Sequence, residues 1–146
     1  MNRVNYAAVI VAGIVFWIIE AGWYTLLSKP YIAALGMTPE QVAAAQSNVS
    51  FVPYLTALLS NCVIAYVIAI IMLRTGGASA QHGAMTALVL WMGFVATVLA
   101  TTYSFEQRPF SLFAINSGAM LLGMIACGAI VGAWKGKAPA TSAAGA

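Results

Sequence analysis

The chain has 146 residues, of which 62% are hydrophobic and only 6% are charged, and its mean hydropathy is +0.92. Soluble domains carry about 25% charged residues, so this composition excludes a water-soluble globular fold and predicts an integral membrane protein. The formal net charge of +3 is small and the basic residues are scattered, so nucleic acid is not expected as a partner.

Four apolar runs are each long enough to cross a membrane, which takes about 20 residues as a helix. Helices are favoured because an open sheet edge cannot satisfy its backbone groups in lipid. We therefore predict an all-α, integral membrane four-helix bundle. A single transmembrane domain is expected over residues 1–137, with a flexible tail at 138–146. The predicted spans cover residues 6–27, 51–73, 82–102 and 111–134.

A short interfacial helix is predicted between the first and second spans. Thr38 is a good helix cap, Pro39 suits the first helical position, and Glu40 places an acid in the first turn. The alanine-rich stretch at residues 42–46 would continue this helix.

The distribution of lysine and arginine predicts the orientation of the bundle. With four spans, both termini and the second connection share one side of the membrane. That side holds Arg3, Arg74, Lys135 and Lys137, and the opposite side holds Lys29 and Arg108. The bias predicts a multi-pass protein with both termini in the cytoplasm, and in a bacterial inner (plasma) membrane the side that holds Lys29 and Arg108 would face the periplasm.

Glu20 is the only charged residue of the first apolar run. An acid at the centre of a membrane helix costs roughly 2.5–3.5 kcal/mol on insertion scales, so this side chain is expected to face protein or water, or to be protonated. Three roles are open. Glu20 can fix helix packing by hydrogen bonding, it can bind a ligand, an ion or a proton, or it can contact a partner subunit.

Each span also has one candidate inward face at helical spacing. The faces are Gly13, Trp17, Glu20 and Tyr24; Tyr54, Ala57, Asn61 and Ala65; Gly93, Thr97 and Thr101; and Asn116, Met120, Gly123 and Cys127. Their polar members concentrate in the outer half of the bundle. This pattern predicts an outer-facing polar pocket or cluster rather than a continuous pore.

The candidate ligand-binding residues are Glu20, Tyr24, Asn61, Thr97, Asn116 and Arg108. The two asparagines can instead form structural hydrogen bonds across helices. Arg108 can pair with Glu106 in its own loop or bend inward toward Glu20. Trp23, Tyr24, Tyr103 and Trp134 lie at span ends and are expected first as anchors in the membrane interface.

No metal site, cofactor or catalytic residue is predicted. His82 has no second ligand close in sequence, and Cys62 and Cys127 lie inside apolar runs, where small packing residues are expected rather than a disulfide. A phosphate-binding loop, a nucleophile elbow and a paired-acid motif are all lacking. An enzyme is therefore disfavoured, though one carboxylate leaves the question open.

Gly128 and Gly132 form a GxxxG pair in the last span. Small residues at this spacing let two helices approach closely. The pair predicts either a contact with another helix of the same chain or a homodimer.

Five segments together resemble the small bacterial membrane proteins grouped as domain-of-unknown-function family 1761. They are Gly22 to Tyr24, Ala34 to Glu40, Gly93 to Thr97, Phe105 to Pro109 and Gly128 to Trp134. The resemblance covers nearly the whole chain up to Trp134. It implies a four-span inner-membrane protein and no established activity or catalytic role.

Three functions remain open at this point. The leading hypothesis is a pocket that binds a small molecule, a lipid headgroup or an ion, with transport if the chain forms an oligomer. The second is an accessory or scaffold subunit of a membrane complex. The third is a membrane enzyme acting on a lipid or isoprenoid, with Glu20 as acid or base.

Overall fold

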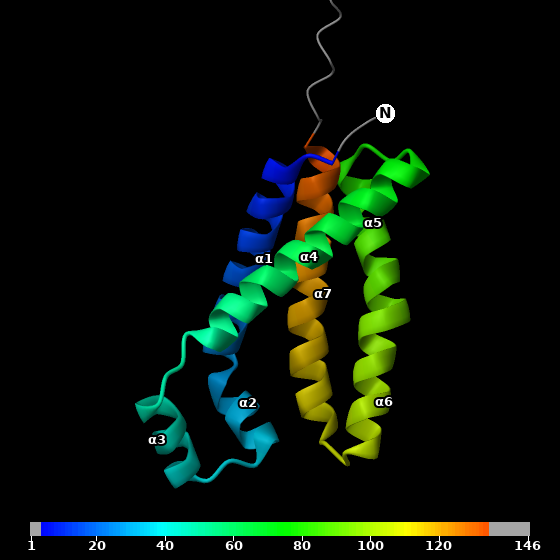
Figure 1. Ribbon diagram of the computed structural model, residues 1–146. Helices are drawn as coiled ribbons and strands as arrows, with labels where there is room; N and C mark the ends of the chain where they lie inside the picture. The colour runs from blue at the N-terminus through cyan, green and yellow to red at the C-terminus, as the bar shows by residue number, and fades with distance from the viewer. Residues whose placement is uncertain (1–3, 135–146) are drawn as a thin grey trace, which may run out of the picture.

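The computed structural model describes residues 4–134, which form helices joined by short connections (Figure 1). No strand occurs among the described residues. The elements are α1 Tyr6–Leu26, α2 Ser28–Leu35, α3 Pro39–Ser47, α4 Val52–Thr75, α5 Ala80–Leu90, the π-helix η1 Trp91–Ala96, α6 Thr97–Phe105 and α7 Phe110–Ala133.

Four of these stretches are long and apolar enough to cross a membrane: α1, α4, α7 and the continuous run Ala80–Phe105 formed by α5, η1 and α6. The all-α bundle with four potential spans is thereby confirmed. The third span is longer than the predicted 82–102. The single domain at 1–137 stays a prediction, and the tail at 138–146 lies outside the described residues.

The connection between α1 and α4 contains two short helices rather than one. The predicted helix is α3, where the Thr38 side chain accepts from the Gln41 backbone N–H at 3.3 Å and the Gln41 side chain accepts from the Thr38 N–H at 2.9 Å. The unpredicted helix is α2, which accommodates Pro30 in its first turn because no intrahelical N–H bond is needed there. It ends at Gly36, whose φ of 68° favours glycine.

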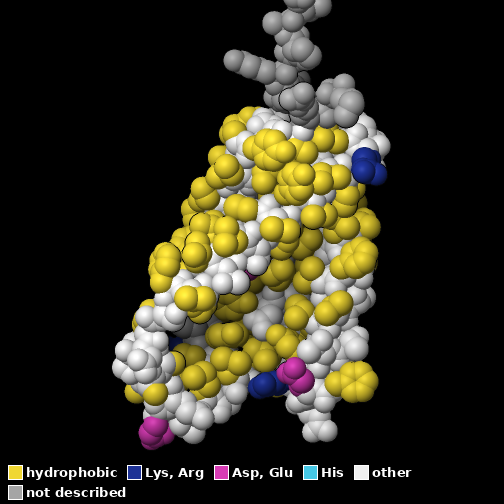
Figure 2. Space-filling view, viewed as in Figure 1, with side chains coloured by type: hydrophobic (Ala, Val, Ile, Leu, Met, Phe, Trp, Pro, Cys, Tyr) yellow, Lys and Arg dark blue, Asp and Glu magenta, His cyan; other side chains and the backbone are white. Residues whose placement is uncertain are grey.

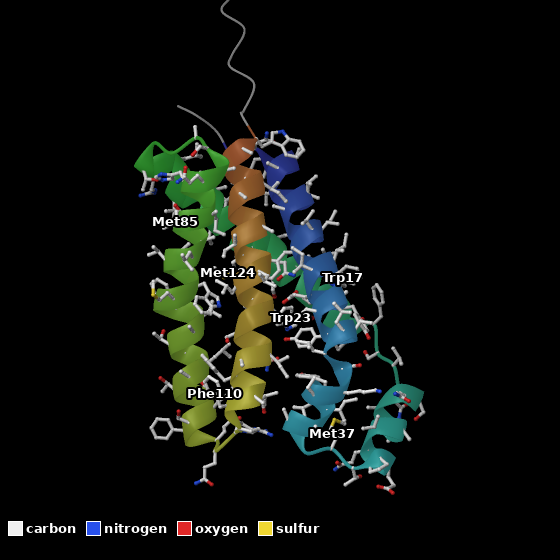
Figure 3. The ribbon with its side chains drawn as sticks, turned by 180° about the vertical axis from the view of Figure 1, so that it is seen from behind. Trp17, Trp23, Met37, Met85, Phe110 and Met124 are labelled. Carbon is white, nitrogen blue, oxygen red and sulfur yellow. The ribbon has the colours of Figure 1, made fainter. Side chains whose placement is uncertain are left out.

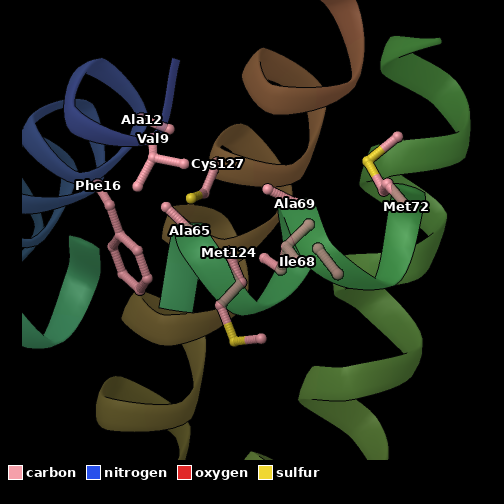
Figure 4. Close-up of a cluster of buried hydrophobic side chains, with 10 residues drawn as sticks. Val9, Ala12, Phe16, Ala65, Ile68, Ala69, Met72, Met124 and Cys127 are labelled. Carbon is pink, nitrogen blue, oxygen red and sulfur yellow. The ribbon is translucent and has the colours of Figure 1, made fainter. Parts of the chain in front are cut away.

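The bundle is organised around α7, which packs on α1, α5 and α4. In Figure 1, α4 runs diagonally across the bundle, while α2, α3 and the α6–α7 loop lie together at one end. The start of α1 and the end of α7 lie at the opposite end. The core lies where α1, α4 and α7 meet (Figure 4), and its largest fully buried side chains are Phe16, Ile68 and Cys127.

Glycine permits the closest approach, between α5 and α7. A Cβ atom on Gly128 would lie 2.2 Å from the backbone oxygen of Gly83, and one on Gly132 would lie 2.3 Å from the oxygen of Ser79. Both glycines of the GxxxG pair are buried within the chain. The pair therefore makes the first of its two predicted contacts, with a neighbouring helix of the same chain, and the homodimer stays a prediction.

The inward face predicted for the third span is wrong. Gly93, Thr97 and Thr101 are exposed, whereas the buried residues of this span are Gly83 and Ala87. Each threonine hydroxyl donates to the backbone oxygen four residues earlier, so these side chains satisfy themselves without a partner helix. The sequence pattern also did not indicate the π-helix η1, whose wider turn lies between α5 and α6.

Candidate functional site

An open groove of about 490 Å³ lies between the end of α1 with α2 on one side and η1 with α6 on the other. Part of α7 forms a third wall. In Figure 2 the surface is hollowed below α4, between α2 and α6, and hydrophobic side chains line the hollow. The groove is lined by Tyr24, Tyr31, Phe94, Val95, Val98, Leu99, Tyr103, Asn116 and Met120.

A row of three hydrogen-bonded side chains crosses the groove. Tyr24 of α1 donates its hydroxyl to Asn116 Oδ1 at 2.8 Å, and Asn116 Nδ2 donates to the Tyr103 hydroxyl oxygen at 2.7 Å. The row joins α1, α7 and α6. The proton of the Tyr103 hydroxyl has no acceptor among the described residues and can be donated to a molecule in the groove.

Tyr31 brings a third phenol to the same place. Its ring packs edge-on against Tyr24, with 5.1 Å between the ring centroids. Burial, and then the neighbouring Tyr103, raise the pKa of the Tyr31 phenol above its ordinary value. Tyr31 therefore stays a neutral O–H donor at physiological pH.

Glu20 and Asn61 form a separate pair beside the groove. Asn61 is buried in α4 and donates its side-chain N–H to Glu20 Oε2 at 2.6 Å. Glu20 precedes Tyr24 by one turn of α1, so the pair and the tyrosine share one face of that helix. The hydrogen bond agrees with the packing role that the sequence left open for both residues.

The remaining two candidate residues lie apart from this arrangement. Thr97 is exposed, does not line the groove, and donates to the Gly93 backbone oxygen at 2.7 Å. Arg108 pairs with Glu106 of its own loop at 3.2 Å rather than with Glu20. The structure therefore brings together Tyr24 with Asn116 and Glu20 with Asn61, and it separates Thr97 and Arg108 from both pairs.

Sequence reasoning missed several polar contacts to α7. Trp23 and Tyr103 were expected first as interface anchors, yet Trp23 Nε1 donates to the Ile115 backbone oxygen at 2.9 Å and Tyr103 bonds Asn116. Figure 3 shows Trp23 between α1 and α7. Trp91 Nε1 donates to the Ser117 backbone oxygen at 2.9 Å. Aromatic residues near span ends were the available signal, but their spacing did not reveal which helix they would face.

Metal ligands do not gather in the described part of the chain. Residues 4–134 contain no group of three His, Cys, Asp or Glu side chains that could hold an ion. The side chains that line the groove offer hydrogen bonding from phenols and an amide, combined with apolar contact.

A family model matches residues 7–132, which is most of the chain. The chain belongs to the family described as "Protein of unknown function (DUF1761)". No curated protein and no solved structure matches it. Membership in DUF1761 confirms the resemblance drawn from the sequence.

Proposed function

We propose that this protein binds a lipid-like small molecule in the groove between α1 with α2 and η1 with α6. The observation that carries the proposal is the hydrogen-bonded row Tyr24–Asn116–Tyr103 within an otherwise apolar groove. Small-molecule sites commonly combine apolar walls with a few placed polar groups, and they measure about 300–1,000 Å³. The groove, at about 490 Å³, has both properties.

The side chains that line the groove indicate which class of ligand it can bind. Five of the nine lining residues are wholly apolar, and no charged residue lines the groove; the five are Phe94, Val95, Val98, Leu99 and Met120. An apolar body therefore suits the walls better than a free ion does. The phenol O–H groups of Tyr31 and Tyr103 can donate to a hydrogen-bond acceptor on the ligand. A carbonyl or phosphoryl oxygen at one end of the ligand would be such an acceptor.

The proposal narrows the pocket hypothesis drawn from the sequence. An amphiphile with an acceptor group replaces the broader choice of small molecule, headgroup or ion. Among the candidate residues, Tyr24 and Asn116 keep a direct role, and Tyr103 and Tyr31 join them. Arg108 is engaged with Glu106, so it is not assigned to the ligand.

A binding measurement tests the proposal. Triphenylphosphine oxide has apolar rings and one strong acceptor oxygen, so we would measure its affinity for the protein in phosphatidylcholine nanodiscs, with empty nanodiscs as background. Tyr103→Phe removes the donor proton and should weaken binding about three- to tenfold, as expected for one neutral hydrogen bond.

Tyr54→Phe is the matched control, because Tyr54 lies on α4, is exposed and does not line the groove. Its affinity should equal that of the wild type. Equal loss in both variants, or no specific binding by the wild type, would contradict the proposal.

We also propose that the protein lies in the bacterial inner membrane with both termini in the cytoplasm. The four helices long and apolar enough to cross a membrane support the membrane location, and the excess of lysine and arginine on the side of the termini supports the orientation. The groove lies toward the end with α2 and α3, and this orientation places that end on the periplasmic side. A membrane-impermeant maleimide should therefore label Ser47→Cys in α3 of intact spheroplasts and should not label Ser79→Cys between α4 and α5. The reverse labelling would invert the orientation.

A further inference from the structure

Glu20 has one satisfied and one unsatisfied carboxylate oxygen. Oε2 accepts from Asn61 Nδ2 at 2.6 Å, and Oε1 has no hydrogen-bond partner in the described part of the chain. No fully buried side-chain oxygen or nitrogen of these residues lacks a partner, so Oε1 must be accessible from outside the packed core.

No cationic side chain of residues 4–134 approaches this carboxylate. The one ion pair described within 4.0 Å joins Arg108 to Glu106. A charged group within a membrane span normally pairs with an opposite charge, faces a water-filled cavity or serves a functional site. The Glu20 carboxylate therefore has no counter-ion within 4.0 Å among the residues that the structure describes.

The position of Glu20 connects it to the groove. Phe16, one turn earlier in α1, is fully buried and packs against Gly123 of α7. Tyr24, one turn later, lines the groove. Glu20 thus lies on the same helix face at the boundary between the packed core and the groove, and Asn61 of α4 holds its carboxylate there.

The neighbouring side chains suit an organic cation better than a metal ion. One carboxylate and one amide are too few ligands for a typical inorganic site, whereas aromatic rings attract organic cations through their electron-rich faces. Tyr24 and Tyr31 supply two such rings, packed at 5.1 Å between centroids.

We propose that Glu20 binds the positive charge of a cationic amphiphile whose apolar part occupies the groove. The ligand class is an organic ammonium or phosphonium ion with an attached apolar body. This inference rests on the proposed function and adds the charge of the ligand, because Glu20 would discriminate a cationic molecule from a neutral one of similar shape.

Two probes distinguish the cation site at Glu20 from the proposed ligand site in the groove. Tetraphenylphosphonium is a lipophilic cation without an acceptor, and triphenylphosphine oxide is a neutral counterpart with an acceptor. Both would be titrated into phosphatidylcholine nanodiscs that contain wild type, Glu20→Gln or Tyr103→Phe. Glu20→Gln should weaken tetraphenylphosphonium binding roughly tenfold or more, since a charged interaction is lost, and should leave triphenylphosphine oxide within about twofold of wild type.

Several outcomes overturn the inference. If Glu20→Gln binds tetraphenylphosphonium as the wild type does, or if the wild type does not bind it specifically, Glu20 serves helix packing only. If Glu20→Gln does not fold, the wild type alone decides: it should bind tetraphenylphosphonium at least about tenfold more tightly than the anionic isostere tetraphenylborate. Equal binding of the two ions contradicts a cation site.

The proposed function fails by a different pattern. Triphenylphosphine oxide would then bind independently of Tyr103, or not at all, whatever happens to the cation. The wild type could instead bind triphenylphosphine oxide through Tyr103 while its binding of the cation does not depend on Glu20. That result would support the ligand site in the groove and contradict only the cation site at Glu20.

Discussion

At the residue scale, two backbone contacts that only glycine permits hold α5 against α7. Gly128→Leu places side-chain atoms where the Gly83 backbone oxygen lies, 2.2 Å from the Cβ position. Overpacking of this kind costs about 1–3 kcal/mol, and here the obstacle is backbone rather than a movable side chain. We expect a clear fall in the melting temperature in detergent.

Gly22→Ala is the matched control for this substitution. Gly22 also lies within a spanning helix, but a Cβ atom there meets nothing within 4 Å. Alanine in place of a helical glycine should leave stability unchanged or raise it by up to about 1 kcal/mol. A Gly128→Leu protein that melts with the wild type would show that α5 and α7 do not cross at these glycines.

Asn61 is the buried polar residue whose side chain bonds Glu20. Hydrogen bonds between membrane helices contribute about 0.6 kcal/mol on average and up to about 1.7 kcal/mol. Asn61→Ala should therefore lower the free energy of unfolding, measured by denaturant titration in mixed micelles, by about 1 kcal/mol. The exposed Asn48→Ala should have no effect. Equal stability of Asn61→Ala and wild type would show that the bond does not stabilise the fold.

Which residues meet could be predicted only in part. Helical spacing places Glu20 and Tyr24, Asn61 and Asn116 on the predicted inward faces of three spans, so the sequence indicated polar neighbours for Glu20. Spacing within one helix does not fix its rotation against a neighbour, so it could not show that Asn61 alone reaches Glu20. Tyr103 was not predicted as a groove residue, because its position at the end of a span is equally typical of an anchor in the membrane interface.

At the element scale, α3 is stabilised by its own N-terminal residues. A backbone N–H, and then the Thr38 hydroxyl, lower the pKa of Glu40 below its ordinary value. A lowered folded pKa stabilises the helix at pH values above the unfolded pKa, and this contribution is lost as the pH falls through the folded pKa. Amide exchange across residues 39–47, corrected for intrinsic rates, should therefore become faster as the pH falls through that value in wild type.

Glu40→Gln removes this titration and should abolish the pH dependence of corrected exchange in α3. Thr38→Ala removes the capping hydroxyl and should destabilise α3 by about 1 kcal/mol at neutral pH. Exchange in α7 should stay the same in both variants. A pH dependence that persists in Glu40→Gln would assign the effect to another group.

The π-helix η1, like α2, is an element that the sequence did not reveal. Its residues, Trp91–Ala96, continue an apolar run, and hydrophobic periodicity does not distinguish a wide turn from an α-helical one. Trp91 fixes this segment through the 2.9 Å bond from its indole N–H to the Ser117 oxygen. Trp91→Phe should lower stability by about 0.5–1.5 kcal/mol and speed exchange in α6. Trp134→Phe, at an exposed tryptophan with no side-chain bond described, should do neither.

At the scale of the whole molecule, the sequence predicted the four potential spans because apolar runs of about 20 residues have few other structural outcomes. It could not predict the groove. The groove exists because α6 packs on α7 less closely than α5 does, and because α4 crosses the bundle diagonally. Helix tilts are set by packing between helices, such as the Gly83–Gly128 approach, and they leave no periodic signal in one span.

Much of the apolar surface of the bundle is exposed, so lipid is expected to contact it nonspecifically at many positions. Leu59 and Val63 of α4 are 59% and 61% exposed, so a lipid-like molecule can touch many positions without a specific site. A specific groove must therefore be distinguished from general contact with lipid.

Photocrosslinking with position-by-position mass spectrometry makes that distinction directly. A diazirine-bearing fatty acid methyl ester offers an apolar chain and one carbonyl acceptor, and it can be added to protein in phosphatidylcholine nanodiscs. The account predicts labels concentrated at Val98, Leu99 and Met120, reduced by excess triphenylphosphine oxide and by Tyr103→Phe. Labels spread equally over these residues and over Leu59 and Val63, with no competition, would contradict a ligand site in the groove.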